Sequence, residues 1–584
     1  SSVLKSNTTG FLNTAVGYEA MLSNTTGAHN TALGHQALFT NNANYNVAIG
    51  DKALYTNSTG DSNVAVGRFV LMSNTTGVQN TAIGNYALDT NTTGDYNVAC
   101  GMNALTAATT ADSNTAVGHG AASALTTGYQ SVAVGRDALK TCSTGYQNVA
   151  LGHWALENYT GNATVAVGNQ ALEDLTTGTQ NTALGHDSGR DLTTGANNTA
   201  LGYATLSTST GSTYNVAVGV NALKLATTGA SNTALGAEAL DTLTTGSSNV
   251  AVGSEALDDC TTGGNNVAVG TRALQTSTTV SNQTAIGYFA LNANTTGGEN
   301  CAVGYEALMD NTTGSRNTAL GTFSLENNTT GDDNTALGRN TLAENTTGYQ
   351  NVAVGRDALD ANTGGAANTA VGKDALTANT TANNNTAVGK SALAANTTGS
   401  ENTSVGTASL DANTTGSYNT GVGHNALGAT TTTSENTAVG YAALGANTGE
   451  KNVAIGNQSL ALATTGDRNT AIGNYSMADA VVTGNQNTAV GDNALRELTS
   501  GTLNTGLGCQ ALYNNTTASY NTAVGYNSLF NVTTSQYNTA MGYQAGDAIT
   551  TGSGHNACFG YGAGGSLTTG PFNTSIGASA HRLD

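Results

Sequence analysis

A short sequence returns about every 17 residues along this chain, and this repeat limits the folds open to it. It first appears complete as Asn13–Gly17 (NTAVG) and is still present at Asn573–Gly577 (NTSIG). We count 34 copies, so 33 steps cover the 560 residues from Gly17 to Gly577. The unit reads N-[TV]-A-[VLI]-G-x-x-A-L-x-x-N-T-T-G-x-x, numbered here as positions 1–17. Such a period is typical of a solenoid, in which each repeat forms one coil stacked on the next.

Positions 1–4 predict a short strand, because Thr and Val favour extended backbone. Neighbouring residues of a strand point to opposite faces, so positions 2 and 4 share one face and position 3 lies on the other. Position 4 is always apolar, and position 3 accepts only small residues. We therefore predict that both faces of the strand are packed. Positions 8 and 9, such as Ala37 and Leu38, supply a second pair of apolar side chains.

The remaining positions predict turns and a row of stacked amides. Gly at position 5 suits a bend or a close backbone approach, and Thr-Thr-Gly is a loop signal. Position 1 is Asn in 31 of 34 copies. An amide at one position of every coil can bond to the amide or backbone of the next coil. We predict a structural Asn ladder that begins with Asn13, Asn30, Asn46, Asn63, Asn80 and Asn97.

The predicted fold is an all-β parallel β-solenoid of the β-roll type, with about 34 coils of about 17 residues. No change in composition marks a boundary, so we predict a single elongated domain over residues 1–584. At a strand spacing of about 4.8 Å the stack would be on the order of 160 Å long. The net charge of −20 disfavours nucleic acid and anionic membranes as partners. No apolar run is long enough to be inserted in a membrane.

The sequence offers little chemistry. His and the carboxylates show no repeated pairing that would hold a metal, and no nucleophile set or phosphate loop is present. We therefore predict a protein that is not an enzyme and that uses no cofactor or metal. The six cysteines are isolated, which indicates buried or half-buried substitutes for other residues. Asn24, Asn91, Asn294 and Asn311 begin Asn-x-Thr sequons, which would carry glycans in a eukaryotic secretory pathway and be plain turns in a bacterium or phage.

One charged row stands out at position 6. The same slot holds a cation in four consecutive coils: Arg339, Arg356, Lys373 and Lys390. Like charges in such a row repel, which suggests a contact with an anionic glycan or a neighbouring subunit. The alternative is that Asp357 and Asp374, next along the chain, offset them. Aromatic residues in or beside this slot, such as Tyr18 and Tyr305, would stack on sugars or pack on the surface.

The motif Asn-Thr-Ala-Val-Gly-Tyr-x-Ala-Leu, seen at Asn436–Leu444, resembles the head repeats of YadA-like trimeric autotransporter adhesins. It is still more similar to repeats of bacteriophage and marine bacterial tail-fibre-like proteins. The resemblance covers the whole chain and implies a left-handed β-roll, a homotrimer and an extracellular location, whether secreted, cell-surface or virion. The 17-residue unit departs from the adhesin heads by a longer loop.

Three functions follow from these observations. The first is an extracellular structural fibre or filament subunit that assembles with itself. The second is an adhesin or tail-fibre shaft that presents position 6 to cell-surface glycans, and the third is ice binding through regular Thr rows. The chain begins inside a repeat, so we expect that Ser1 follows processing or lies within a longer protein. Its start shows no clear cap, and its end has only Pro571 and a short tail, which predicts end-to-end stacking as the alternative to a homotrimer.

Overall fold

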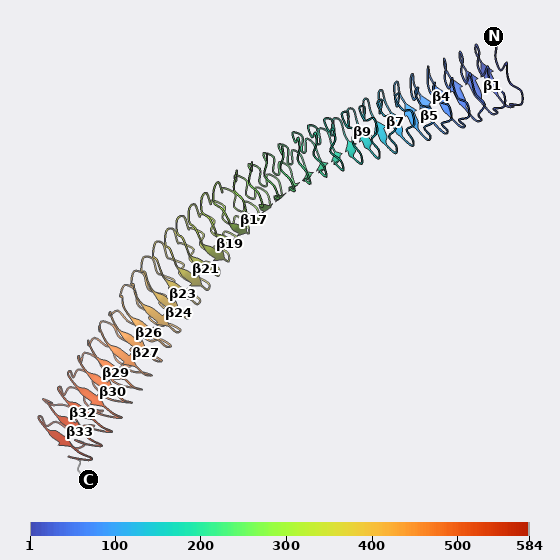
Figure 1. The fold of residues 1–584 in the computed structure, drawn as a ribbon. Coiled ribbons are helices and arrows are strands. Elements are labelled where there is room, and N and C mark those ends of the chain that lie inside the picture. Colours follow the sequence, from blue (N-terminus) through green and yellow to red (C-terminus); the bar gives the residue numbers. More distant parts are fainter. Residues whose placement is uncertain (1, 582–584) are drawn as a thin grey trace. The chain divides into compact units, whose positions relative to one another are not determined.

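The computed structural model describes residues 2–581, which form 34 strands of three residues each and no helix (Figure 1). The chain divides into two compact units, Ser1–Thr296 and Gly297–Asp584. The 17-residue sequence repeat continues on both sides of this division. Each unit is described below by itself.

Unit 1 holds seventeen strands, one in each coil. They are β1 Thr14–Val16, β2 Thr31–Leu33, β3 Val47–Ile49, β4 Val64–Val66, β5 Thr81–Ile83, β6 Val98–Cys100, β7 Thr115–Val117, β8 Val132–Val134, β9 Val149–Leu151, β10 Val165–Val167, β11 Thr182–Leu184, β12 Thr199–Leu201, β13 Val216–Val218, β14 Thr233–Leu235, β15 Val250–Val252, β16 Val267–Val269 and β17 Thr284–Ile286.

Unit 2 repeats the same pattern. Its strands are β18 Cys301–Val303, β19 Thr318–Leu320, β20 Thr335–Leu337, β21 Val352–Val354, β22 Thr369–Val371, β23 Thr386–Val388, β24 Thr403–Val405, β25 Thr420–Val422, β26 Thr437–Val439, β27 Val453–Ile455, β28 Thr470–Ile472, β29 Thr488–Val490, β30 Thr505–Leu507, β31 Thr522–Val524, β32 Thr539–Met541, β33 Ala557–Phe559 and β34 Thr574–Ile576.

Within each unit every strand pairs in parallel with the strand of the next coil, and equivalent repeat positions face each other. Thr14 aligns with Thr31 and Ala15 with Ala32. The 16-residue step from β2 to β3 keeps this register, because the missing residue lies in the loop. The predicted all-β parallel β-solenoid with about 17 residues per coil is therefore confirmed. Handedness and a single domain over 1–584 stay predictions.

A second hydrogen-bonded row lies between the strand and the Thr-Thr-Gly loop. Positions 7 and 9 have positive φ, as in Gln36 (54°) and Leu38 (50°). Gln36 N–H donates to the preceding coil at Tyr18 (2.9 Å), and Leu38 N–H donates to the following coil at Ala53 (2.9 Å). The alternating backbone thus joins each coil to both neighbours. The sequence did not indicate this, because Leu rarely adopts the left-handed region.

The interior of each coil is narrow. Position 3 faces positions 8 and 9 directly: a methyl group built on Gly421 would lie 2.6 Å from Ser409 Oγ and 3.3 Å from Leu410 Cδ1. This explains why position 3 is never large. Position 5 is equally constrained, because Gly34 has φ of +144° and a Cβ there would lie 2.3 Å from the carbonyl oxygen of Gly50. Both close approaches fit the predicted tight contacts.

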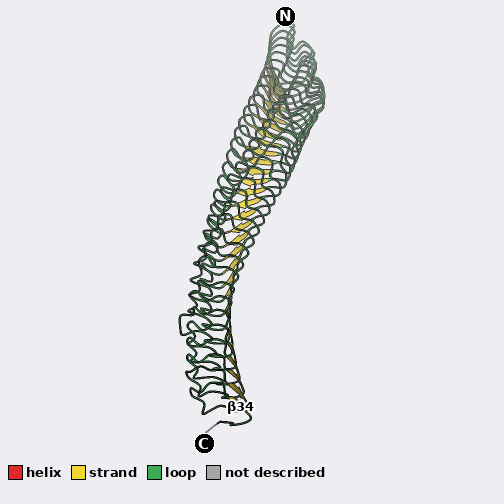
Figure 2. Ribbon diagram, turned by 90° about the vertical axis from the view of Figure 1, so that its left-hand side faces the viewer, coloured by secondary structure: helices red, strands yellow, loops and turns green. Residues whose placement is uncertain are grey.

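Within a single chain only one face of the strand is packed, so the prediction that both faces are packed is wrong for the isolated chain. Ala32 at position 3 is 1% exposed, whereas Leu33 at position 4 is 47% exposed. Each coil contributes one strand, and the rest of the coil packs only against the face that carries position 3. Positions 2 and 4 therefore point outward. Figure 2 shows the strands along one side of the coils, with loops and turns forming the rest.

Candidate functional site

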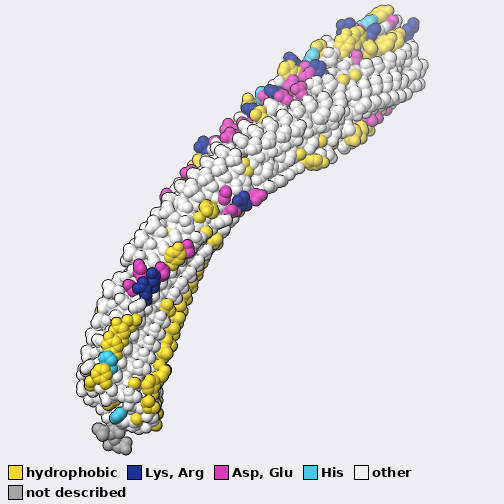
Figure 3. Space-filling view, turned by 60° about the vertical axis from the view of Figure 1, so that its left-hand side comes forward, with side chains coloured by type: hydrophobic (Ala, Val, Ile, Leu, Met, Phe, Trp, Pro, Cys, Tyr) yellow, Lys and Arg dark blue, Asp and Glu magenta, His cyan; other side chains and the backbone are white. Residues whose placement is uncertain are grey.

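The outward sheet face carries a continuous apolar row at position 4 in each unit, beside a row of mainly Thr and Val at position 2. Every strand carries an apolar residue at position 4, and none of these side chains is buried. Leu184 and Leu235 in unit 1 are 45% and 47% exposed, and Leu320 and Met541 in unit 2 are 46% exposed. Side chains stacked in adjacent coils shield each other, so such values mark a sheet face that no other described part of the chain covers. Figure 3 shows hydrophobic side chains in a continuous row along unit 2.

The position-1 amides join successive coils to one another. Asn13 Oδ1 accepts a bond from the backbone N–H of Asn30 (2.9 Å), and the same bond links Asn30 to Asn46 (2.9 Å). The Nδ2 atom of Asn13 donates to the carbonyl of Gly27 (2.8 Å). The following amides repeat the Oδ1 bond from coil to coil: Asn46, Asn63, Asn80 and Asn97.

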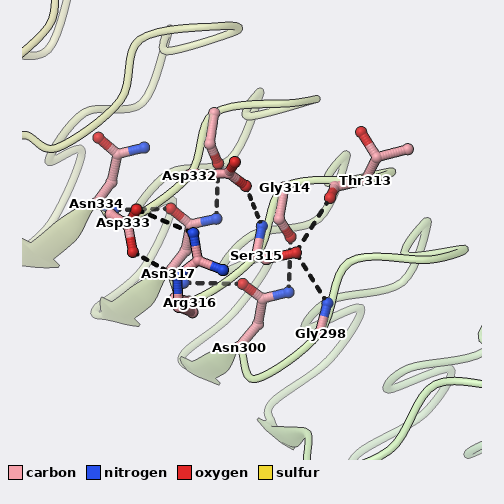
Figure 4. Close-up of polar contacts among 11 residues, drawn as sticks. Gly298, Asn300, Thr313, Gly314, Ser315, Arg316, Asn317, Asp332, Asp333 and Asn334 are labelled. Carbon is pink, nitrogen blue, oxygen red and sulfur yellow. Dashed lines mark hydrogen bonds and ion pairs between the residues drawn. The ribbon is translucent and has the colours of Figure 1, made fainter.

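Figure 4 shows the same arrangement in unit 2, where Asn300, Asn317 and Asn334 follow one another. Asn300 also donates from Nδ2 to the carbonyl of Gly314 (2.8 Å). The charged pair beside this row, Arg316 with Asp333 (2.6 Å), joins adjacent coils at position 17. These amides therefore serve the stacking of coils.

A second buried amide row lies at position 12, where sequence reasoning identified only a loop. Asn74 Nδ2 donates to Asn57 Oδ1 (2.7 Å), and Asn91 Nδ2 donates to Asn74 Oδ1 (2.8 Å). The runs of consecutive coils with Asn at this position, such as Asn24 to Asn91 and Asn294 to Asn413, were the signal that could have revealed it. Sequon asparagines, including Asn24 and Asn294, occupy this row and are 0% exposed. This burial supports the plain-turn interpretation, since a glycan on Nδ2 has no space there.

The cations at position 6 lie on successive coils, and all four are exposed. The Asp357 N–H donates to the Arg339 carbonyl (3.0 Å), and equivalent bonds follow down the row. Two of the cations have carboxylate partners on the next residue: Arg356 with Asp357 (2.8 Å) and Lys373 with Asp374 (2.9 Å). Among the described residues Arg339 and Lys390 form no ion pair. The row is thus half neutralised by its own neighbours.

Aromatic rings form stacked rows rather than open platforms. At position 6, Tyr526, Tyr543 and Tyr561 stack with ring centroids 5.2 and 5.0 Å apart. Tyr18 likewise stacks on His35, with centroids 5.6 Å apart. Because each ring covers the face of the next, these rows present mainly ring edges to solvent. This geometry weakens the hypothesis that they bind sugars by stacking.

The two threonines of the loop differ. The first donates its hydroxyl to the next coil, as Thr75 Oγ1 does to the carbonyl of Thr92 (2.9 Å). The second, such as Thr76, points outward and is exposed. Only one Thr per loop therefore offers a free hydroxyl to a lattice.

The cysteines are unpaired, with Cys142, Cys260 and Cys558 buried, while Cys100 is exposed at position 4 of the sheet face. Burial raises the pKa of the Cys260 and Cys558 thiols to about 11.

Across residues 2–581 no group of three or more His, Cys, Asp or Glu side chains is placed to hold a metal, and no pocket is found. In the same range no helix has the length and apolarity to cross a membrane. No family model and no curated protein matches the chain.

Proposed function

We propose that this protein is a non-enzymatic structural subunit of an extracellular fibre. The observation that supports this most is the number of independent rows that join each coil to the next. In the coil of β4, backbone N–H groups at positions 2, 5, 7, 9, 11 and 13 all donate to adjacent coils. Two amide rows add side-chain bonds to these. A stack held in this way resists local opening, because every coil is fixed from both sides.

The number of repeat positions that serve the fold also favours a structural role. Stacking and packing within the chain involve the residues at positions 1, 3, 5, 8, 9 and 12, so only the outward positions can contact other molecules. The outward residues in and beside the loop differ in charge and size from coil to coil, whereas the outward residue at position 4 is always apolar. Self-assembly, end to end or as a homotrimer, remains part of this proposal.

The adhesin alternative retains one supporting observation, the exposed and unpaired Arg339 and Lys390. Replacing all four position-6 cations by Gln tests it: an adhesin for anionic glycans loses retention on a sulfated glycan column, and a structural fibre keeps its assembly. Ice binding has weaker support, since half of the loop threonines use their hydroxyls internally. A thermal-hysteresis measurement on the purified chain tests that alternative.

The structural proposal is tested by electron microscopy and limited proteolysis of the purified full chain. A fibre subunit should form elongated particles that resist protease and keep their β-type circular dichroism in moderate urea. Flexible, rapidly digested particles would contradict it.

A further inference from the structure

The apolar sheet face needs a cover, and its composition identifies what kind. Positions 2 and 4 hold Thr, Val, Leu, Ile and a few other uncharged residues in every strand of both units. Seventeen strands about 4.8 Å apart, each about 10 Å long, give one unit a face on the order of 800 Å², which exceeds the largest apolar patch of about 300–600 Å² on a typical monomer. It also matches the area of about 800 Å² that each partner contributes to a standard protein interface.

Charge favours a second copy over a different partner. The chain carries a net charge of −20, so identical chains repel one another at most orientations. The sheet face is the exception, because no strand carries a charged residue at positions 2 or 4. A copy of this chain can therefore approach this face without bringing like charges together, whereas a basic partner would find no complementary charge on it.

Shape leads to the same partner. The face repeats at every coil, with one residue at position 2 and one at position 4, and equivalent residues are in register from coil to coil. Two faces with the same repeat can interdigitate along their full height, as identical sheets do at a spacing of about 10 Å. Apolar side chains then exclude water continuously instead of at scattered contacts.

We propose that copies of this chain pack against one another through the outward face formed by positions 2 and 4. This inference rests on the proposed structural function and names the surface through which the fibre would assemble. Cys100 at position 4 of β6 lies on this face and is exposed in the single chain, so it reports on the contact. Met102, at position 6 of the same coil, is 45% exposed and lies beside the face.

The experiment uses the full chain and two matched variants. The first carries Ile83→Lys and Val117→Lys, which place charges on the face in the coils on either side of Cys100. The control carries Met102→Lys and His119→Lys, which add the same charges at position 6. Mass is measured by sedimentation, Cys100 labelling by a maleimide and peptide mass spectrometry, and folding by circular dichroism.

The natural chain should sediment as a multimer, and its Cys100 should be protected. At a total chain concentration about ten times the dissociation constant of a dimer, about one fifth of the chains are free, so labelling slows about fivefold because only the free fraction reacts. The variant with charges on the face should lose this protection while keeping its circular dichroism, and the control should retain it. A natural chain that stays monomeric, or equal protection in both variants, overturns the inference. A monomer that still forms protease-resistant elongated particles leaves the structural function standing.

Discussion

Two groups of coils fill the same interior position in opposite ways. In unit 2, position 12 is Asn in each coil from Asn311 to Asn413, and each Nδ2 donates to the preceding Oδ1 at 2.7–3.0 Å. In unit 1, eleven coils from Ala108 to Ser277 carry no Asn there. Their position-12 residues are all buried: Ala108, Leu125, Cys142, Tyr159, Leu175, Leu192, Ser209, Ala226, Leu243, Cys260 and Ser277.

The loop backbone has the same geometry whether position 12 is Asn or another residue. A Cβ built on the loop glycine would lie 2.4 Å from Leu125 Cδ1 in one group and 2.4 Å from Asn362 Oδ1 in the other. Eight of these eleven side chains are apolar, and the three polar ones form no row from coil to coil: Tyr159 and Ser209 bond only to residues close by in the chain. This largely apolar filling therefore has no direction and can stop at any coil. The amide row has a direction, so its last acceptor has no donor: Asn91 Oδ1 and Asn413 Oδ1 are buried without a hydrogen-bond partner. The two groups therefore differ in how they tolerate an interruption.

The largest effect should be the same in both groups. Gly168→Ala lies in an apolar-filled coil and Gly372→Ala in an amide-filled coil, where the new methyl would lie 2.2 and 2.5 Å from the next coil's carbonyl oxygen. With φ near +140° at both positions, we expect each to cost about 3 kcal/mol or more of local opening free energy. Hydrogen exchange of the full chain measures this locally. A clear difference between the two variants would show that the fillings alter the backbone.

The next effect should separate the groups. Asn362→Leu interrupts the amide row, leaving Asn345 Oδ1 without its donor and removing one acceptor from Asn379. We expect a loss of about 2 kcal/mol in the opening free energy of these coils. Cys260→Leu is the matched control in the apolar group, where no row depends on the replaced side chain, and should change it by less than about 1 kcal/mol. Equal losses would refute the directional account.

The orphaned acceptor at the end of the row should be movable. Ala108→Asn extends the row of unit 1 by one amide, whose Nδ2 would donate to Asn91 Oδ1 and whose own Oδ1 would become the unpaired last acceptor. We therefore expect little net change in the local opening free energy, with the new bond contributing about 1 kcal/mol. In an Asn91→Ala background the same substitution lacks this bond and should be about 1 kcal/mol less favourable, which a double-mutant cycle by hydrogen exchange measures. An effect of Ala108→Asn that is the same with and without Asn91 would be due to packing instead.

The smallest effect is electrostatic. Burial, with the charges of Asp259 and Asp241 beside it, raises the pKa of Asp258 from 3.8 to about 6. The folded coil then holds the proton more tightly than the unfolded chain, so stability is highest at low pH and falls as pH rises through about 6. This carboxyl is partly solvated, so we expect a change of less than about 1 kcal/mol. Exchange rates corrected for intrinsic chemistry at pH 5 and 7 measure it, and Asp258→Asn should remove the difference.

The repeat predicted the coil, its parallel stacking and its small interior residues, because period, β-branching and residue size leave direct traces in sequence. It did not predict which face of the strand is open. Val16 and Leu33 are apolar like core residues, and sequence pattern cannot tell a side chain that packs inside its own chain from one that awaits another surface. The position-12 row was missed for a related reason, since Asn before Thr-Thr-Gly is also a turn signal.

The linear repeat is enough to predict the 17-residue coil, the Ala and Leu interior and the amide at position 1, because these depend on contacts between equivalent residues of adjacent repeats. Three features emerge only in the folded chain: positions 2 and 4 face outward, Leu38 and its equivalents adopt positive φ, and ring faces in the aromatic rows are covered. These features depend on how the chain closes each coil, and closure is set by turns and opposing walls that a linear pattern does not record.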